Sequence, residues 1–256
     1  LLGNSCDYTA IKALCDKHNL LLIEDNCESM GAFYDGQFTG TIGLAGSFSF
    51  FFSHHIQTME GGMVLCRNID DAHYLRSMRA HGWVRDLPAN SPLYEKTGNA
   101  FNDNFVFATA GYNVRPLEMS GAIGLEQLKK WPLIQHTRTQ NAMHFRDLFE
   151  SKPWCRIQKI IGRSSWFTFG MVLDGVLKGR RSEVITALDQ AGIQNRPLAS
   201  RNFLKQPVMR DLDYIDNQDY SAADDIHDNG FFVGNGSEDI RHHIDNMYEV
   251  ITKFTE

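Results

Sequence analysis

The sequence has no stretch approaching the roughly 18 consecutive apolar residues that a membrane-spanning helix needs. It also lacks any run of lysines or arginines, and its formal net charge is −6. An acidic chain without a basic patch is a poor partner for nucleic acid and for anionic membrane surfaces. We therefore expect a protein with neither kind of partner.

Cysteine is also sparse. The five cysteines are scattered, and no two of them form a C-x-x-C pair. An odd number of dispersed cysteines is typical of reduced thiols, so we expect a cytoplasmic protein. Internal repeats and low-complexity tracts are missing too. Apolar residues make up 43% and charged residues 22% of the 256 residues, which indicates a globular chain of one or two domains with a sizeable core.

Local signals predict the first elements. Asp7 is expected to cap a helix that ends at Asn19. The apolar run Leu20–Ile23 predicts a parallel strand covered on both faces, with Asp25 at its carboxyl end, where open α/β sheets place ligand groups. Tyr34–Gln37 is typical of a hairpin turn.

Further start and stop signals predict the rest of the chain. Pro116 suits the first turn of a helix that Pro132 should break or kink, and Ser237 is expected to cap the last helix. We place a boundary near 135, giving domains 1–135 and 136–256. The other expected elements are a helix capped by Asp70 or Asp71 and ending near Met78, a long loop over 82–110, helices over 133–150 and 182–191, and strands over 166–173 and 230–233.

The most informative stretch is SFSFFFSHHIQTMEGG, residues 47–62. Its first residues alternate between serine and phenylalanine, which predicts a strand with the serines on one face. A polar loop with His54 and His55, a glycine turn and a second strand over Met63–Cys66 follow. This arrangement is typical of a site at strand ends. On these residues alone, a buried hairpin with two solvent-facing histidines is an equally good interpretation.

This stretch resembles the cofactor-lysine segment of the DegT-type sugar aminotransferases, pyridoxal-phosphate (PLP) enzymes of the aspartate aminotransferase fold. The family pattern is roughly S-F-S-F-x-x-x-K-N followed by G-E-G-G. Its lysine falls on His54, its asparagine on His55, and its usual first glycine on Met59. Other matching segments occur in order along the chain: LLIEDNCESMGA at 21–32, RAHGW at 79–83, GYNVRPLEMSGAIGLEQL at 111–128 and GFFVGN at 230–235.

The resemblance implies an α/β protein of PLP fold type I, with a mixed, mostly parallel sheet between helices and a smaller α+β C-terminal domain. Domain 1–135 is then the C-terminal part of the large cofactor-binding domain, and 136–256 is the small domain. By the same pattern, the N-terminal third of the fold is expected to be absent from this sequence. That third would hold the turn that cradles the cofactor phosphate and the aromatic residue that stacks on the ring.

Histidine in place of the lysine marks a small branch of the family, the sugar 3-dehydratases. The resemblance thus implies PLP/PMP-dependent removal of the 3-hydroxyl from a nucleotide-linked 4-keto-6-deoxy sugar, expected to be GDP-4-keto-6-deoxymannose. L-glutamate would regenerate pyridoxamine phosphate (PMP). Imidazole is a good general base near neutral pH but cannot hold PLP as lysine does, so we expect a non-covalent cofactor and His54 as the base. No lysine between Lys17 and Lys96 replaces the missing one, and Ser53 is expected to steer the base or the substrate.

The resemblance also assigns the cofactor contacts. Asp25 would keep the pyridine nitrogen protonated; otherwise it is a strand-end aspartate that caps a turn. Glu28 stands where many relatives carry Gln or His beside the ring hydroxyl. Ser49 would bind the phosphate, although a serine paired within the sheet is a credible alternative. Asn113 would reach the phosphate of the neighbouring subunit's cofactor, which implies a homodimer with shared active sites; a turn asparagine fits equally well.

Three further residues, Arg79, His81 and Arg196, are weaker candidates for diphosphate or carboxylate contacts, because solvated surface charge explains them equally well. No metal site is expected at His54, since no Cys, Asp or Glu stands at ligand spacing around it. An iron–sulfur 3-dehydratase is disfavoured because no cysteine lies between Cys66 and Cys155. An ordinary nucleotide-sugar aminotransferase is disfavoured by the missing lysine. A catalytically silent sugar- or cofactor-binding relative remains an alternative.

Overall fold

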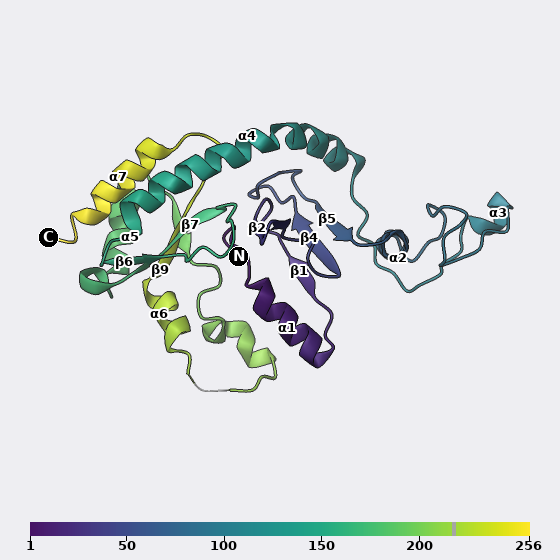
Figure 1. Cartoon of the computed structure of the whole chain (residues 1–256), viewed down its shortest axis with the longest axis horizontal. Helices are drawn as coiled ribbons and strands as arrows, with labels where there is room; N and C mark the ends of the chain where they lie inside the picture. Colours follow the sequence, from purple (N-terminus) through teal and green to yellow (C-terminus); the bar gives the residue numbers. More distant parts are fainter. Residues whose placement is uncertain (217–218) are drawn as a thin grey trace. The chain divides into compact units, whose positions relative to one another are not determined.

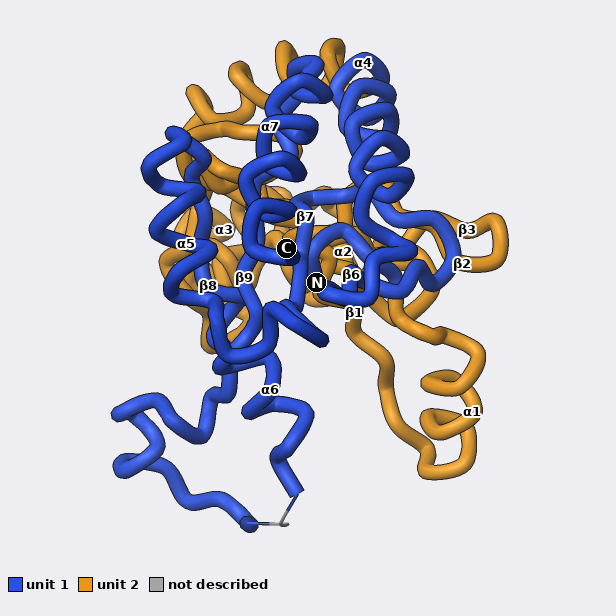
Figure 2. Tube along the Cα trace, turned by 90° about the vertical axis from the view of Figure 1, so that its left-hand side faces the viewer, with its two compact units in different colours: residues 1–5, 132–256 blue, residues 6–131 orange. Residues whose placement is uncertain are grey.

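The computed structural model describes residues 1–216 and 219–256 (Figure 1). The chain divides into two compact units, coloured separately in Figure 2. Unit 1 comprises residues 1–5 and 132–256, and unit 2 comprises residues 6–131. The assignment of 1–135 to a large cofactor-binding domain and of 136–256 to a small one stays a prediction.

Unit 2 is built on a three-stranded sheet in the order β1-β4-β5. β1 (Ile23–Asp25) runs parallel to β4 (Ala45–Ser49), and β4 runs antiparallel to β5 (Gly62–Cys66). A hairpin of β2 and β3 precedes β4, and three helices complete the unit with the first turns of α4. Their bounds are α1 Tyr8–His18, β2 Phe33–Tyr34, β3 Gln37–Phe38, α2 Ile69–Met78, α3 Ala100–Asp103 and α4 Glu118–Phe149.

The ends of α1 and the β2–β3 turn form as their local sequence signals predict. The Asp7 side chain accepts the amide of Ala10, and Asn19 ends α1 in the left-handed conformation with φ of 51°. In the β2–β3 turn, Asp35 and Gly36 both have positive φ, 48° and 76°, as the tight hairpin turn requires. Both sequence predictions are confirmed.

The buried carboxylate of Glu24 fixes the segment that leads into β4. Its oxygens accept the amides of Gly40, Ile42 and Gly43, each at 2.6 Å. Amide donors of this kind compensate a buried carboxylate for its lost hydration. Because successive side chains of a strand point to opposite faces, the next residue, Asp25, lies on the other face and is exposed.

The strand predicted over Leu20–Ile23 is shifted in the structure. β1 begins only at Ile23, and the side chains of Leu20, Leu21 and Ile23 are 58%, 79% and 68% exposed. The expectation that this run is covered on both faces is therefore wrong for the described residues. Only Leu22 of the run is half-buried, and its carbonyl accepts the amide of Leu44 at 2.7 Å.

Helix α4 is continuous over 32 residues and runs through Pro132 without a break. Of the two predicted effects of Pro132, a break with separate helices on either side is therefore wrong, whereas a kink stays a prediction. Proline removes one backbone hydrogen bond and costs about 3 kcal/mol in a helix interior. Beyond it, Phe145 and Phe149 are fully buried in the core of unit 1, and this packing holds the later turns in place.

Unit 1 contains a four-stranded antiparallel sheet in the order β6-β7-β9-β8. Phe169, Leu188, Met247 and Ile251 are among the side chains that fill its core. None of the helices in the described part of the chain has the length and apolar character that crossing a membrane requires. The bounds are β6 Cys155–Ile157, β7 Thr168–Leu173, η1 Gly175–Leu177, α5 Arg181–Gln190, β8 Asn195–Pro197, η2 Phe203–Lys205, η3 Pro207–Asp211, α6 Ser221–Asn229, β9 Gly230–Gly234 and α7 Arg241–Thr252.

Candidate functional site

The carboxyl ends of β1 and β4 meet at one edge of the unit 2 sheet, because the two strands are parallel. Asp25 ends β1 and lies beside Ser47, while Ser49 ends β4. The chain then passes directly into the turn that carries His54. Parallel pairing thus gathers an acid, two hydroxyls and an imidazole-bearing loop at this edge, where open α/β sheets bind ligands.

Asp25 presents an exposed carboxylate. Its Oδ1 accepts the amide of Cys27 at 3.1 Å, and the Ser47 hydroxyl lies 3.4 Å away. Hydrogen bonds from the Cys27 thiol, then from the Cys27 amide, lower the pKa of Asp25 below its ordinary value, with a further contribution from Ser47. The carboxylate is therefore charged at neutral pH and suited to a cationic N–H donor.

The two adjacent histidines have different surroundings. The His54 amide donates to the carbonyl of Phe51 at 2.9 Å, and its half-buried ring lies edge-on to the Phe51 ring at 5.7 Å. His55 is only 3% exposed and packs edge-on against Trp131 at 5.8 Å. The alternative of two solvent-facing histidines is therefore wrong for His55, whose burial fixes one end of the loop.

The Ser49 hydroxyl accepts the amide of Phe51 at 3.2 Å. Because a hydroxyl carries one proton and two lone pairs, its proton remains available to an anionic ligand. Ser53 is exposed, one residue before His54, and Glu28 is half-buried in the segment after β1. Ser49 thus ends β4, while Ser53 lies on the segment after β4 and Glu28 on the segment after β1.

The loop between His54 and β5 has a left-handed residue at Met59, where φ is 68°. Thr58 ties this turn together, since its amide donates to Phe50 O at 2.8 Å and its hydroxyl to Glu60 O at 2.9 Å. The Ser120 hydroxyl of α4 reaches the same Glu60 carbonyl at 3.3 Å. The positive φ explains why glycine is favoured at the position of Met59 in the family pattern.

We expect Met59→Gly to stabilise the protein by about 0.5–1 kcal/mol. A left-handed non-glycine residue destabilises the folded state by roughly 1–2 kcal/mol, and glycine removes this strain. Glycine also makes the unfolded chain more flexible, which offsets about 0.5–1 kcal/mol of the stabilisation. Met63→Gly is the matched control, because Met63 is similarly exposed but lies in β5 and should lose stability. Chemical denaturation of both variants measures the difference, and equal losses would contradict strain at Met59.

A second group of candidates is brought together by backbone pairing of two loops. Ala80 forms an antiparallel bridge with Asn113. On either side, the His81 amide donates to Tyr112 O at 2.8 Å and the Val114 amide to Arg79 O at 2.9 Å. The RAHGW and GYN segments, about thirty residues apart in sequence, therefore lie side by side.

A cationic cluster around Trp83 could not be predicted from the sequence. The guanidinium carbons of Arg85 and Arg115 lie 4.5 and 5.6 Å from the centre of the indole ring, and the His81 ring is 5.2 Å away. Stacking on an aromatic ring orients guanidinium groups without neutralising them. Arg115 lies two residues after Asn113 of GYN, but its contact with Trp83 depends on the pairing of the two loops.

Arg196 belongs to unit 1, whereas the other candidates belong to unit 2. It is exposed on β8, opposite Phe232 of β9. Its grouping with the remaining candidates therefore stays a prediction.

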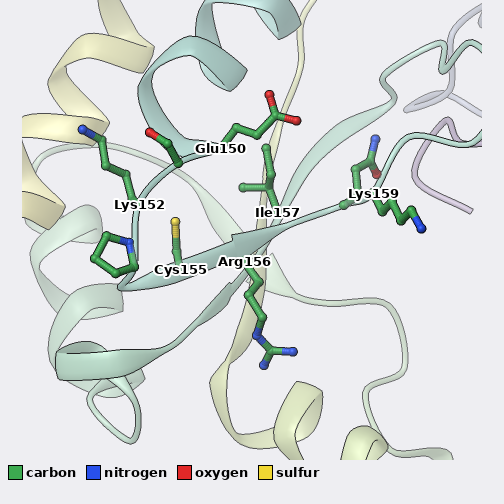
Figure 3. A pocket seen from close by; sticks show the side chains of 9 residues that line it. Glu150, Lys152, Cys155, Arg156, Ile157 and Lys159 are labelled. Atoms are coloured by element: carbon green, nitrogen blue, oxygen red, sulfur yellow. The ribbon is translucent and has the colours of Figure 1, made fainter.

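A surface hollow of about 480 Å³ lies at β6 in unit 1 (Figure 3). Cys155 and Ile157 lie on one side of β6, and Arg156 is directed to the other. Arg156 is already paired with the carboxylates of Asp174, at 2.9 Å, and Asp225. No candidate from the sequence lines this hollow.

Comparison with known proteins gives matches over nearly the whole chain. The model of the DegT/DnrJ/EryC1/StrS aminotransferase family matches residues 1–251. The chain is 45% identical over 255 residues to GDP-4-keto-6-deoxy-D-mannose 3-dehydratase of Yersinia pseudotuberculosis, a match that covers 99% of this chain and 65% of that protein.

Solved structures agree. The E. coli GDP-4-keto-6-deoxy-D-mannose-3-dehydratase with bound hydrated PLP matches with a TM-score of 0.92 and 42% identity, over 98% of this chain and 65% of that one. A GDP-4-keto-6-deoxymannose-3-dehydratase with a trapped PLP-glutamate geminal diamine matches with a TM-score of 0.92 and 41% identity, over 98% and 65% of the two chains. The chain thus spans just under two thirds of the length of these relatives.

Proposed function

Because this chain belongs to the DegT/DnrJ/EryC1/StrS aminotransferase family, we propose that the full-length protein is a cytoplasmic, PLP/PMP-dependent GDP-4-keto-6-deoxymannose 3-dehydratase. The family membership and the PLP fold type expected from the sequence are confirmed by the matches. The activity, the substrate and the partners are proposals for the whole protein.

One observation carries this proposal. By the motif resemblance, His54 falls at the position of the family's cofactor lysine, on the loop that follows β4, and β4 pairs with the strand that ends in the charged Asp25. A lysine there would hold PLP covalently for transamination, whereas a histidine supports proton transfer without that bond. The 45% identical relative is itself named a 3-dehydratase.

The residues present fit PMP. The exposed Asp25 carboxylate, kept charged by its hydrogen bonds, matches a protonated ring nitrogen. The proton of the Ser49 hydroxyl can be donated to a phosphate oxygen, because its amide contact uses the oxygen as acceptor. Glu28 is the proposed neighbour of the ring hydroxyl. When bound, PMP supplies the amino group that bonds to the sugar's keto carbon and the ring that accepts electrons.

In the proposed mechanism, His54 would act as the general base that takes a proton at the methylene carbon of the cofactor, which would allow the 3-hydroxyl to leave. Its edge contact with Phe51 and its backbone bond to the same residue limit the positions of the imidazole. Ser53 steers the base or the substrate. Arg79, His81 and Arg196 are proposed contacts for the diphosphate of the substrate or for the carboxylates of L-glutamate.

The reaction balances as the conversion of the 4-keto sugar and L-glutamate into the 3-deoxy-4-keto sugar, 2-oxoglutarate and ammonia. Full-length protein should be incubated with PLP, L-glutamate and a panel of nucleotide-linked 4-keto-6-deoxy sugars, with products identified by mass spectrometry. Loss of one oxygen atom from the GDP-linked sugar supports the proposal. A sugar that keeps its 3-hydroxyl and gains an amine would indicate an aminotransferase. Cofactor binding without turnover of any sugar would indicate a silent relative.

We further propose a homodimer with shared active sites, in which Asn113 contacts the cofactor of the neighbouring subunit. Asn113 is exposed in its own chain, as such a role requires. His54→Asn and Asn113→Ala homodimers should each be weakly active. After subunit exchange, heterodimers should regain one site with wild-type His54 from one chain and wild-type Asn113 from the other. Verified exchange without recovery would contradict shared sites, and each variant mixed with itself is the control.

A further inference from the structure

Under the proposed function Asp25 is the contact for the ring nitrogen, so its carboxylate must be held facing that nitrogen. Two residues that play no other part in the site, Cys27 and Ser47, converge on it. Cys27 follows two positions later in sequence, and Ser47 lies beside Asp25 across the parallel β1–β4 pair. Together they form what we call the Asp25 cradle.

The cradle engages one side of the carboxylate. The Cys27 amide donates to Oδ1 at 3.1 Å, closing a local turn of the kind that aspartate side chains form with the amide two residues on. The Ser47 hydroxyl lies 3.4 Å from the same Oδ1 and 3.5 Å from the carbonyl of Glu24, so its single proton has two acceptors nearby. Among the described residues, no backbone or hydroxyl donor reaches Oδ2.

The Cys27 side chain is coupled to the same group. Burial, followed by hydrogen bonding to Asp25, raises the pKa of the Cys27 thiol to about 11. The thiol therefore keeps its proton near neutral pH and remains a donor rather than a competing anion. The same contact is the largest cause of the lowered pKa of Asp25. The two groups thus stabilise each other in opposite protonation states, a charged acid beside a neutral thiol.

We propose that Cys27 and Ser47 are positioning residues that hold the Asp25 carboxylate in one orientation, with Oδ1 bound to the Cys27 amide and the exposed carboxylate available to a cationic N–H donor. The identity of that donor, the protonated ring nitrogen of PMP, rests on the proposed function. The cradle itself is a property of this chain and can be tested without cofactor.

The first test measures the rate of iodoacetamide alkylation at each cysteine of the full-length apo protein by peptide mass spectrometry. At mildly alkaline pH, Asp25→Asn should accelerate alkylation of Cys27 about three- to tenfold, because removal of the carboxylate lowers the pKa of the thiol and each unit changes the thiolate fraction tenfold. Cys15 and Cys66, which are also half-buried in unit 2, are internal controls and should keep their rates. An unchanged rate at Cys27 would overturn the coupling.

The second test measures PMP affinity by calorimetry and the absorbance spectrum of bound cofactor. Cys27→Ala and Ser47→Ala should each weaken PMP binding about three- to tenfold, as expected for the loss of one hydrogen-bond donor to a carboxylate. Cys27→Ser keeps a donor of similar size and should recover most of the affinity, whereas Cys27→Val fills the space without a donor and should not; recovery in Cys27→Val would indicate a purely space-filling role. Cys15→Ala on α1 is the matched control. Circular dichroism verifies folding of every variant.

The two tests separate the inference from the function it rests on. If wild-type protein binds no PMP, the proposed function fails, while the alkylation result still decides whether the cradle exists. If PMP binds and neither Cys27→Ala nor Ser47→Ala changes its affinity or spectrum, the positioning role is wrong and the proposed function stands.

Discussion

His54→Asn in the full-length protein is expected to lower the rate of sugar dehydration by about 10²- to 10⁴-fold, the contribution that a positioned general base typically makes. Asparagine has a similar size but cannot accept a proton near neutral pH, so PMP should still bind. Stopped-flow measurement of 3-deoxy sugar formation, with PMP affinity measured in parallel, provides the test. His54→Asn protein that dehydrates the sugar at the parental rate would exclude His54 as the base.

The substitution His54→Lys gives a complementary result. It restores the residue of the family pattern, so PLP should become covalently attached and remain on the polypeptide after borohydride reduction, while dehydration ceases. Wild-type protein treated in the same way should carry no reduced cofactor at the active-site peptide. Gln57→Lys is the matched control, because it places a lysine at an exposed position in the same loop. Equal labelling of both variants would mean that position 54 does not face the cofactor.

Asp25→Ala is the second substitution with a large expected effect. A hydrogen bond between charged groups contributes about 1.5–3 kcal/mol, so PMP affinity should fall roughly ten- to over a hundredfold. Dehydration should fall further, because an unprotonated ring is a poor electron acceptor. Asp16→Ala, on the exposed face of α1, is the control and should leave both quantities unchanged. Cofactor titration with retained affinity in Asp25→Ala would contradict the assignment.

Where a local signal alone decides the structure, the sequence was sufficient. Asp7 and Asn19 bound α1 because capping involves residues within one turn of the helix end. Caps with several candidates were less predictable. Asn68, and not Asp70 or Asp71, caps α2 by accepting the Asp71 amide, which leaves both acids in the first turn.

The remaining errors come from interactions distant in sequence. Ser237 does not cap α7, whose N-cap residue is Ile240 and makes no side-chain capping bond. The burial of Ile244, Met247 and Ile251 against the unit 1 core places that helix instead. Likewise, Pro132 is accommodated within α4 because tertiary packing of the later turns outweighs the loss of one hydrogen bond.

In the candidate site, too, local signals could be predicted and contacts between distant residues could not. The resemblance of the motifs pointed to Asp25, Ser49 and His54, and the parallel pairing of β1 with β4 places the first two at one sheet edge. These assignments stay predictions until the substitutions are made. The partners of Asp25 could not be predicted, because the contact with Ser47 depends on which residues of two strands lie opposite each other. A single strand pattern contains no such information.

The three amide bonds of Glu24 have a consequence for the residue beside it. Glu24 and Asp25 are adjacent acids on opposite faces of one short strand, so a slip of β1 by one residue would exchange their places. Such a slip would move the carboxylate of Asp25 away from the sheet edge that carries the candidate site. It would also break the hydrogen bonds of Glu24 with the amides of Gly40, Ile42 and Gly43. Glu24 therefore fixes the register of β1. It keeps Asp25 exposed at the site although Glu24 itself takes no part in the proposed reaction.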